Sequence, residues 1–273
     1  MRQRGASRSV RGVTNPYESV VSLGKDIYKE FPGHDTNGTS MRLIARDYGP
    51  HEEATPLNPG FSEELWRLKL TIEIGQELSL EFRKRLPQVI GRLAVLFPAL
   101  PNHKCCGSST LIETLLSLEG QSQCGAPDRG AAADVAHVFE HVLIDTISSL
   151  SGVRRCSGIT CGHKEPEHRF DLFVECPNER LGNFASSLAL LIVPELPEPG
   201  ANYSLYSRSI GLARLIARKK MRVLALSTLA QEVNWTVEEI EDTLRLLSDL
   251  GYIAERQYAM NFSGTRSFEV LTV

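Results

Sequence analysis

Residues 131–150 read AAADVAHVFEHVLIDTISSL, and this run predicts the strongest helix in the chain. Gly152 follows the run, and glycine is common just past a helix end. Three polar side chains, His137, Glu140 and His141, interrupt the apolar residues. Polar groups in such surroundings need partners, and binding a metal ion would supply them.

The sequence on either side of this helix predicts a mixture of strands and helices. Alternating apolar and polar residues predict strands over residues 41–48, 66–74, 157–160 and 169–175. Helical spacing predicts helices over residues 79–100, 108–118 and 178–193, the first with a possible kink at a proline and the second capped by serines. Residues 120–130 are expected to form a loop. The expected fold class is α+β, with a metallohydrolase-like domain followed by a small winged-helix domain.

Three segments are expected along the chain. Residues 1–39 are rich in Gly, Ser, Asn and Arg without a sustained period, which favours a disordered basic leader over a transit peptide. Residues 40–198 are expected to form the first domain. Pro194, Pro197 and Pro199 indicate a boundary, and residues 199–273 would form the second domain.

Composition limits the class of protein. The 273 residues are 42% hydrophobic and 23% charged, which is ordinary for a soluble globular protein. The formal charge of −3 predicts no general surface for polyanions. The longest apolar run, residues 184–193, is too short to span a membrane, so no membrane contact is expected. Six cysteines without a secretory signal favour reduced thiols and a cytoplasmic location.

Some of these cysteines offer an alternative metal site. Cys156, Cys161 and His163 are closely spaced, and Cys105 with Cys106 could complete a structural site. The paired short spacing of zinc knuckles is missing. Buried or incidental cysteine is therefore the favoured interpretation.

The central helix carries a more specific signal. His137 and His141 are four residues apart, so both imidazoles can face one ion from the same side of a helix. With Glu140 they match the inverted zinc-peptidase pattern H-x-x-E-H. In that pattern the histidines bind Zn²⁺ and the glutamate takes a proton from water. A third protein ligand is then required.

The same residues also permit a simpler interpretation. A five-residue pattern of this kind arises by chance in roughly one chain in a hundred of this length. His137 and His141 would then be ordinary histidines of an amphipathic helix, with Glu140 a solvated neighbour.

The chain from Ile90 to Ile192 resembles the amino-terminal domain of cyanophycin synthetases. The matching pieces occur in the family's order: RLAVLFPAL at 92–100, AHVFEHVL at 136–143, LSG at 150–152, FVE at 173–175, and Glu179-x-Leu-Gly182. In some members this domain is a zinc metallopeptidase-like site that cleaves the polymer.

The resemblance implies a role for each matching residue. His137, His141 and Glu175 would bind zinc, and Glu140 would be the general base. Glu175 also ends an apolar strand, from which a carboxylate was expected to reach the helix. The other candidates for third ligand are Glu179, Asp171, Glu167 and His168.

Two departures from the family affect the expected reaction. No phosphate-binding loop of the form G-x-x-x-x-G-K-S/T is present, and the chain is too short for the ligase modules of a synthetase. No ATP-driven polymerisation is expected. The stretch around Cys161-Gly-His163 replaces an arginine-containing segment of the family, so substrate preference stays open.

The last part of the chain resembles a winged helix. Helices are expected over residues 209–220, 227–233 and 236–250, and strands over residues 252–260 and 266–271, with a turn between the strands. The third helix exposes Glu238, Glu239, Glu241 and Asp242 against Arg245. Such a helix would repel phosphate, which favours a protein partner or a homo-oligomer over DNA.

The sequence therefore predicts a zinc-dependent hydrolase that cleaves a peptide or isopeptide-like bond. The alternative is a non-catalytic regulator, in which the first domain binds a ligand or metal and the winged helix contacts protein or DNA.

Overall fold

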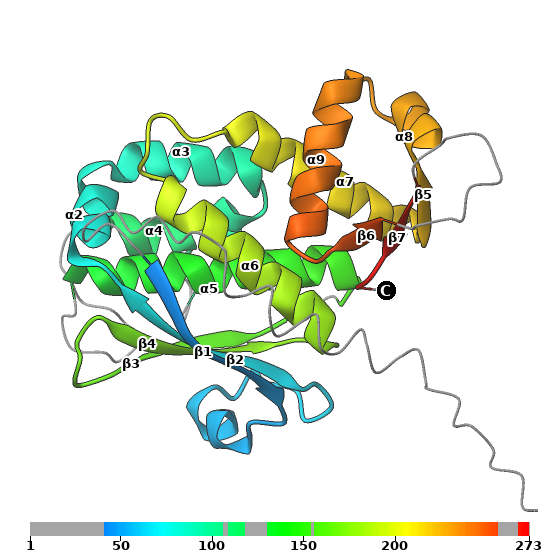
Figure 1. Ribbon diagram of the computed structural model, residues 1–273. Coiled ribbons are helices and arrows are strands. Elements are labelled where there is room, and N and C mark those ends of the chain that lie inside the picture. Colours follow the sequence, from blue (N-terminus) through cyan, green and yellow to red (C-terminus); the bar gives the residue numbers. More distant parts are fainter. Residues whose placement is uncertain (1–40, 106–108, 118–129, 154–155, 256–266, 273) are drawn as a thin grey trace, which may run out of the picture. The chain divides into compact units, whose positions relative to one another are not determined.

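The computed structural model describes residues 41–105, 109–117, 130–153, 156–255 and 267–272, and only the backbone of residues 226–228. The expected leader at residues 1–39 and most of the expected loop at 120–130 lie outside these ranges. The described residues form helices and two antiparallel sheets, so the α+β class is confirmed (Figure 1).

The larger sheet contains the four strands expected between residues 41 and 175. They are β1 (Met41–Gly49), β2 (Arg67–Ile74), β3 (Gly158–Gly162) and β4 (Arg169–Glu175). Their spatial order is β1-β2-β4-β3, and every neighbouring pair is antiparallel. A helix of the 3₁₀ type, η2 (Glu52–Leu57), lies between β1 and β2 in the chain.

The two faces of this sheet differ because side chains alternate along a strand. One face carries the buried Phe170, Leu172 and Val174 of β4, which belong to the main hydrophobic core. The other face carries Phe173, which packs with Ala54 and Phe61 in a small separate cluster.

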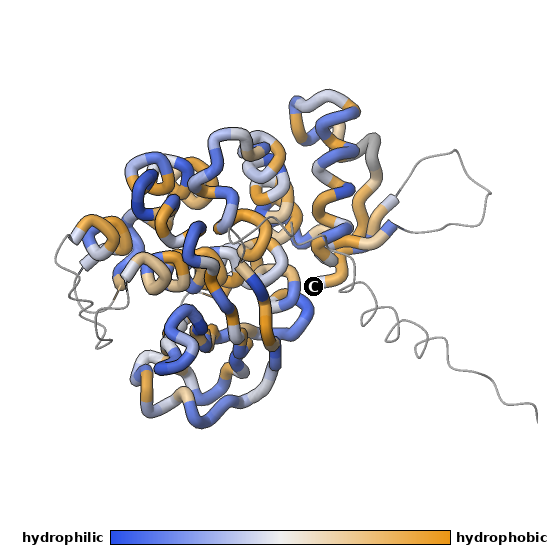
Figure 2. Tube along the Cα trace, turned by 60° about the vertical axis from the view of Figure 1, so that its left-hand side comes forward, coloured by the Kyte–Doolittle hydropathy of each residue, from blue (hydrophilic) through white to orange (hydrophobic). Residues whose placement is uncertain are grey.

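Helix α5 (Gly130–Ser151), which the sequence predicted as the strongest helix, forms the centre of the core. It packs against strands β2, β3 and β4 and against helices α2, α6 and α7 (Figure 1). Helix α6 (Glu179–Glu195) covers β1 and α5, and its first turn is capped by the side chain of Asn178. In Figure 2, hydrophobic and hydrophilic positions alternate along many of the helices, as amphipathic helices require.

The prediction of a single helix over residues 79–100 is wrong. The chain forms α2 (Gln76–Lys84) and α3 (Leu86–Leu96), separated at Arg85, whose φ of −109° and ψ of 22° are not helical. Pro87 lies in the first turn of α3, where its missing N–H costs no hydrogen bond. The proline therefore starts a new helix and does not kink a continuous one.

Two short helices follow α3. They are η3 (Leu100–Asn102) and α4 (Leu111–Leu116). The prediction that serines cap α4 is wrong, because Thr110 is its cap. The Thr110 side chain accepts from the backbone N–H of Glu113, and the Glu113 side chain accepts from the backbone N–H of Thr110.

The described residues from 199 onward contain three helices and a three-stranded sheet. The elements are α7 (Tyr203–Lys219), β5 (Val223–Ala225), α8 (Leu226–Glu232), α9 (Val237–Asp249), β6 (Ile253–Glu255) and β7 (Ser267–Val270). The sheet order is β5-β7-β6, with antiparallel pairs. Strand β5 was not expected from the sequence, and the predicted turn at 261–264 lies outside the described residues.

Helix α7 joins this part to the preceding helices. It packs against α3 and α5, and Arg214 on α7 donates to Asp145 on α5 at 2.6 Å. Within the described ranges, no helix combines the length and apolar character needed to cross a membrane.

Candidate metal centre

Cys105, His137 and His141 bring three metal-ligating atoms together. One ligand atom of each residue lies within 4.8 Å of those of the other two. The thiol sulfur of Cys105 is 2.8 Å from Nε2 of His137, and the Nε2 atoms of the two histidines are 3.1 Å apart. His137 and His141 therefore lie on one side of α5, as their four-residue spacing predicted. The third residue of the cluster, Cys105, comes from the segment before α4.

Burial keeps both imidazoles neutral. It lowers the pKa of His137 to about 4. The pKa of His141 is also well below its ordinary value, mainly through burial and then through His137 and His103. A neutral imidazole keeps a ring nitrogen lone pair available at neutral pH, which a metal ligand needs.

His103 contacts the cluster from its outer side. Its Nδ1 lies 2.8 Å from Nδ1 of His141, and the two rings meet edge to face at 5.0 Å between centroids. The other ring nitrogen of His141 faces His137. His103 therefore holds the ring nitrogen of His141 that points away from the cluster, as outer partners of metal-binding histidines do.

The donor set fits a transition metal ion. One thiol and two neutral imidazoles suit zinc and disfavour magnesium or calcium, which prefer oxygen ligands. His141 is buried, whereas Cys105 and His137 are partly exposed. Three protein ligands with partial exposure match a site that retains one position for water or substrate.

Glu140 points from the same helix toward strand β3. Its Oε2 accepts a hydrogen bond of 2.5 Å from Thr160, and its Oε1 lies over Gly158. A Cβ atom at Gly158 would come within 2.8 Å of Oε1, so the glycine makes room for the carboxyl group. Burial raises the pKa of Glu140 to about 7, although the bond from Thr160 opposes this shift.

The structure does not bring Glu175 to the histidines. Its side chain is buried and accepts hydrogen bonds from two backbone N–H groups, those of Ser62 and Ser157, the second at 2.8 Å. It follows Phe173 by two residues and so shares the face opposite α5. In the described part of the chain, the third residue of the cluster is Cys105 and not Glu175.

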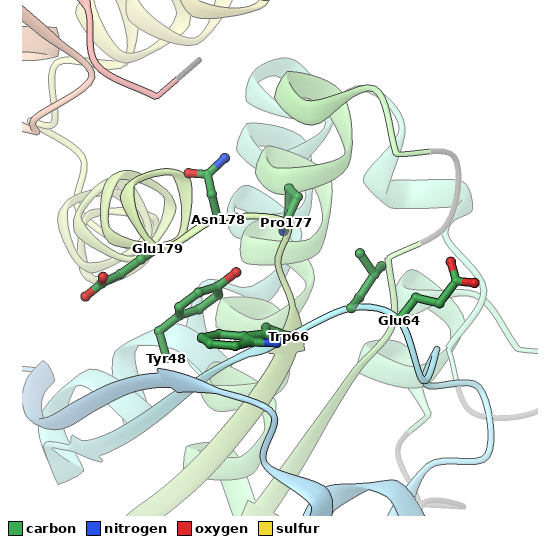
Figure 3. A pocket seen from close by; sticks show the side chains of 7 residues that line it. Tyr48, Glu64, Trp66, Pro177, Asn178 and Glu179 are labelled. Carbon is green, nitrogen blue, oxygen red and sulfur yellow. The ribbon is translucent and has the colours of Figure 1, made fainter.

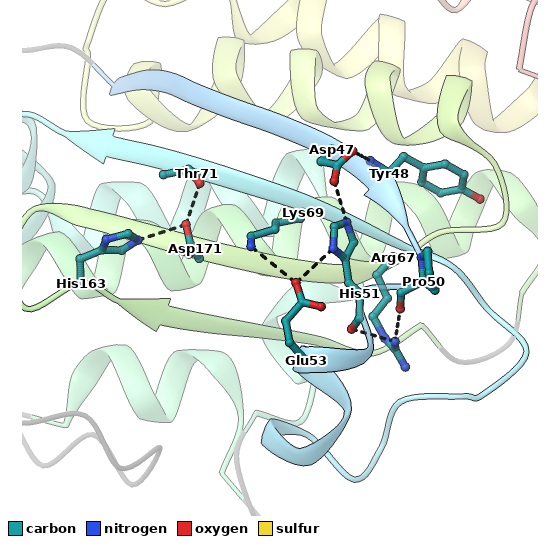
Figure 4. Close-up of polar contacts among 10 residues, drawn as sticks. All are labelled: Asp47, Tyr48, Pro50, His51, Glu53, Arg67, Lys69, Thr71, His163 and Asp171. Carbon is teal, nitrogen blue, oxygen red and sulfur yellow. Dashed lines mark hydrogen bonds and ion pairs between the residues drawn. The ribbon is translucent and has the colours of Figure 1, made fainter.

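The other candidates for third ligand also lie apart from the cluster. Asp171 is on the outer face of the sheet, where it accepts a 2.7 Å hydrogen bond from Thr71 and faces His163 at 3.1 Å (Figure 4). Glu167 and His168 are exposed between β3 and β4, and Glu179 lines a separate pocket.

The alternative site at Cys156, Cys161 and His163 is not assembled among the described residues. Cys156 donates to the backbone oxygen of Glu175 at 2.7 Å, and burial raises the pKa of its thiol well above the ordinary range. Such a thiol is a poor metal ligand at neutral pH. Cys106 lies outside the described residues.

Sequence reasoning missed one residue of the cluster, Cys105, and the neighbouring His103. Cys105 was considered only for the alternative site, and His103 was not considered. The available signal was the short spacing His103-x-Cys105, which places an imidazole and a thiol close together between η3 and α4. The bridge between Lys104 and Thr110 holds this segment in place.

Comparison of the chain with protein-family profiles, with curated proteins and with solved structures found no match.

Proposed function

We propose that the protein is a zinc-dependent hydrolase of a peptide or isopeptide-like bond, with Cys105, His137 and His141 as zinc ligands. The observation that carries the proposal is the approach of these three ligand atoms to within 4.8 Å of one another. A zinc ion bound there would polarise a carbonyl group and lower the pKa of a bound water molecule.

Glu140 would be the group that moves a proton. A carboxyl group with a pKa near 7 can accept a proton and release it at neutral pH. This proposal keeps Glu140 as the general base, as the sequence predicted. It replaces Glu175, the third ligand predicted from the sequence, with Cys105.

The resemblance to the amino-terminal domain of cyanophycin synthetases suggests a first class of substrates. Polymers of aspartate and arginine, which contain isopeptide bonds, belong in a substrate screen together with ordinary peptides. The thiol ligand is a departure from the family pattern, so the site can differ in its substrate as well.

Glu140→Gln separates binding from chemistry. The variant should retain zinc, because Glu140 is not a ligand, and should lose about a hundredfold or more in hydrolysis. The exposed Glu167→Gln is the matched control and should change neither property. Full activity of Glu140→Gln on a substrate that the wild type cleaves would overturn the assigned base. A zinc-loaded wild type that cleaves nothing in the screen would favour the second candidate.

The second candidate is a non-catalytic regulator that binds a ligand or metal and contacts a partner through its carboxy-terminal part. The order α7-β5-α8-α9-β6-β7, with β7 between β5 and β6, supports a winged helix there. On α9, Glu238 and Asp242 are exposed, and Glu239 is paired with Arg208 at 3.0 Å. This acidic surface suits a protein partner or a second copy better than DNA.

A DNA titration distinguishes the two kinds of partner. The full chain should bind duplex DNA only weakly at physiological salt. Tight, sequence-selective binding would show that DNA is the partner of the winged helix.

A further inference from the structure

An open pocket of about 400 Å³ lies where β1 ends, β2 begins and α6 begins, and it involves none of the cluster residues (Figure 3). Two aromatic rings form one wall. Tyr48 and Trp66 are 5.3 Å apart between ring centroids and are tilted by 45°. The side chain of Trp66 is 52% exposed, so its ring face remains accessible to a ligand.

Two carboxylates lie beside the aromatic wall. Figure 3 shows Glu179 next to Tyr48 and Glu64 on the far side of Trp66. Neither carboxylate forms an ion pair with any cation in the described ranges, and no basic side chain lines the pocket. The pocket therefore combines two aromatic rings with two negative charges, and no basic side chain of the described residues lines it.

Two other polar side chains of the pocket form hydrogen bonds within the protein. Tyr48 donates its hydroxyl proton to the backbone oxygen of Cys176 at 3.1 Å. The side chain of Asn178 accepts from the backbone N–H of Leu181 and so caps α6. The pKa of Tyr48 is raised, chiefly by burial and then by the charges of Cys176 and Glu179, so its hydroxyl stays protonated.

We propose that this pocket binds an organic cation, a guanidinium or alkylammonium group, on the Tyr48–Trp66 pair, with Glu64 and Glu179 supplying negative charge from its two sides. A cation is attracted by the negative face of an aromatic ring and by a carboxylate, and its apolar stem can cover the indole. This site is independent of the proposed hydrolase chemistry.

An anion is excluded as the ligand by the same groups. The start of α6 attracts negative charge, but Glu179 already occupies its first turn and Asn178 takes one of its backbone donors. An anionic ligand would be repelled by the carboxylates of Glu64 and Glu179. A purely apolar ligand would leave these charges partly desolvated without compensation.

Fluorescence of Trp66 tests the proposal directly. The chain has two tryptophans, so Trp235→Phe leaves Trp66 as the only one. This protein should be titrated with n-butylguanidinium, n-butylammonium and the neutral n-butylurea at constant ionic strength. We expect saturable changes in emission with at least one cation and none with n-butylurea. The relative affinities of the two cations identify the preferred head group.

Charge-neutral variants assign the carboxylates. In the Trp235→Phe background, Glu64→Gln and Glu179→Gln should each weaken cation binding by about two- to fivefold, as expected for partly exposed charges. Glu63→Gln removes the same charge from an exposed neighbour outside the pocket and should leave the affinity unchanged. Thermal unfolding should show that all three variants are folded.

The proposal is overturned if neither cation changes the emission of Trp66, or if n-butylurea binds as well as the cations. It is also overturned if Glu63→Gln weakens binding as much as Glu64→Gln and Glu179→Gln do. That result would show only a general effect of surface charge.

Discussion

The thiol sulfur of Cys105 lies 2.8 Å from Nε2 of His137, although the two residues are 32 positions apart in the chain. The segment before α4 thus supplies a third ligand to a pair of histidines that α5 already holds on one face. The metal-site proposal depends on this contact, because two histidines one turn apart are common and do not define a site by themselves.

His103 should tune metal affinity without binding the metal. His103→Leu removes the partner of His141 Nδ1 and should weaken zinc binding by about ten- to a hundredfold. His103→Asn, which retains a hydrogen-bonding group near that position, should recover part of the loss. Zinc dissociation constants from competition with a chelator measure the effect.

His168→Leu is the matched control for this series, because His168 is exposed and lies between β3 and β4. It should not change the zinc affinity. Equal zinc affinities of His103→Leu and wild type would contradict the positioning role.

Gly158→Ala should destabilise the fold. The added Cβ would lie 2.8 Å from Glu140 Oε1 and 3.0 Å from Ile144 Cδ1, and overpacking of this kind costs about 1–3 kcal/mol. Gly211→Ala is the control, because nothing lies within 4 Å of its added Cβ on helix α7, and it should stabilise by about 0.5–1 kcal/mol. Urea unfolding of the two variants and the wild type measures these changes in the free energy of unfolding. A Gly158→Ala protein as stable as wild type would contradict the described packing of Glu140.

Glu140 should make the stability of the metal-free protein depend on pH. Burial raises its folded-state pKa from 4.5 to about 7, so folding favours the protonated form. Its contribution is fully present below about pH 4.5 and is lost as the pH rises through about 7. The shift corresponds to at most about 3 kcal/mol.

Comparison with Glu140→Gln isolates this effect, because glutamine resembles the protonated acid. Metal-free Glu140→Gln should differ little from wild type near pH 5 and become clearly more stable than wild type by pH 8. The opposing contribution of His137, whose pKa is about 4, is the same in both proteins and cancels. Urea unfolding in the presence of a chelator checks the prediction. A constant difference between pH 5 and pH 8 would contradict it.

Local sequence patterns predicted much of the fold. The apolar period of α5 and the alternation in β4 are strong signals, and both elements were predicted to within a residue. The division at Arg85 was missed because Pro87 fits equally well as a kink or in the first turn of a helix. Strand β5 was missed because three residues are too few to show a period.

The site was predictable only in part. The spacing of His137 and His141 fixes their common face, and this needed no tertiary information. The alternation of β4 places Glu175 on the same face as Phe173 and opposite Val174, but the sequence alone did not show which of the two faces meets α5. The meeting of Cys105 with His137 depends on how the segment before α4 crosses α5, and no local pattern encodes that crossing.

The zinc content of three proteins tests the metal centre most directly. Wild type, Cys105→Ser and Glu175→Gln should be purified, supplied with zinc, dialysed and measured by elemental analysis. Wild type and Glu175→Gln should each hold about one zinc per chain, and Cys105→Ser should hold far less because a three-ligand site does not tolerate loss of one ligand. Full zinc content in Cys105→Ser, together with its loss in Glu175→Gln, would contradict the assignment of Cys105.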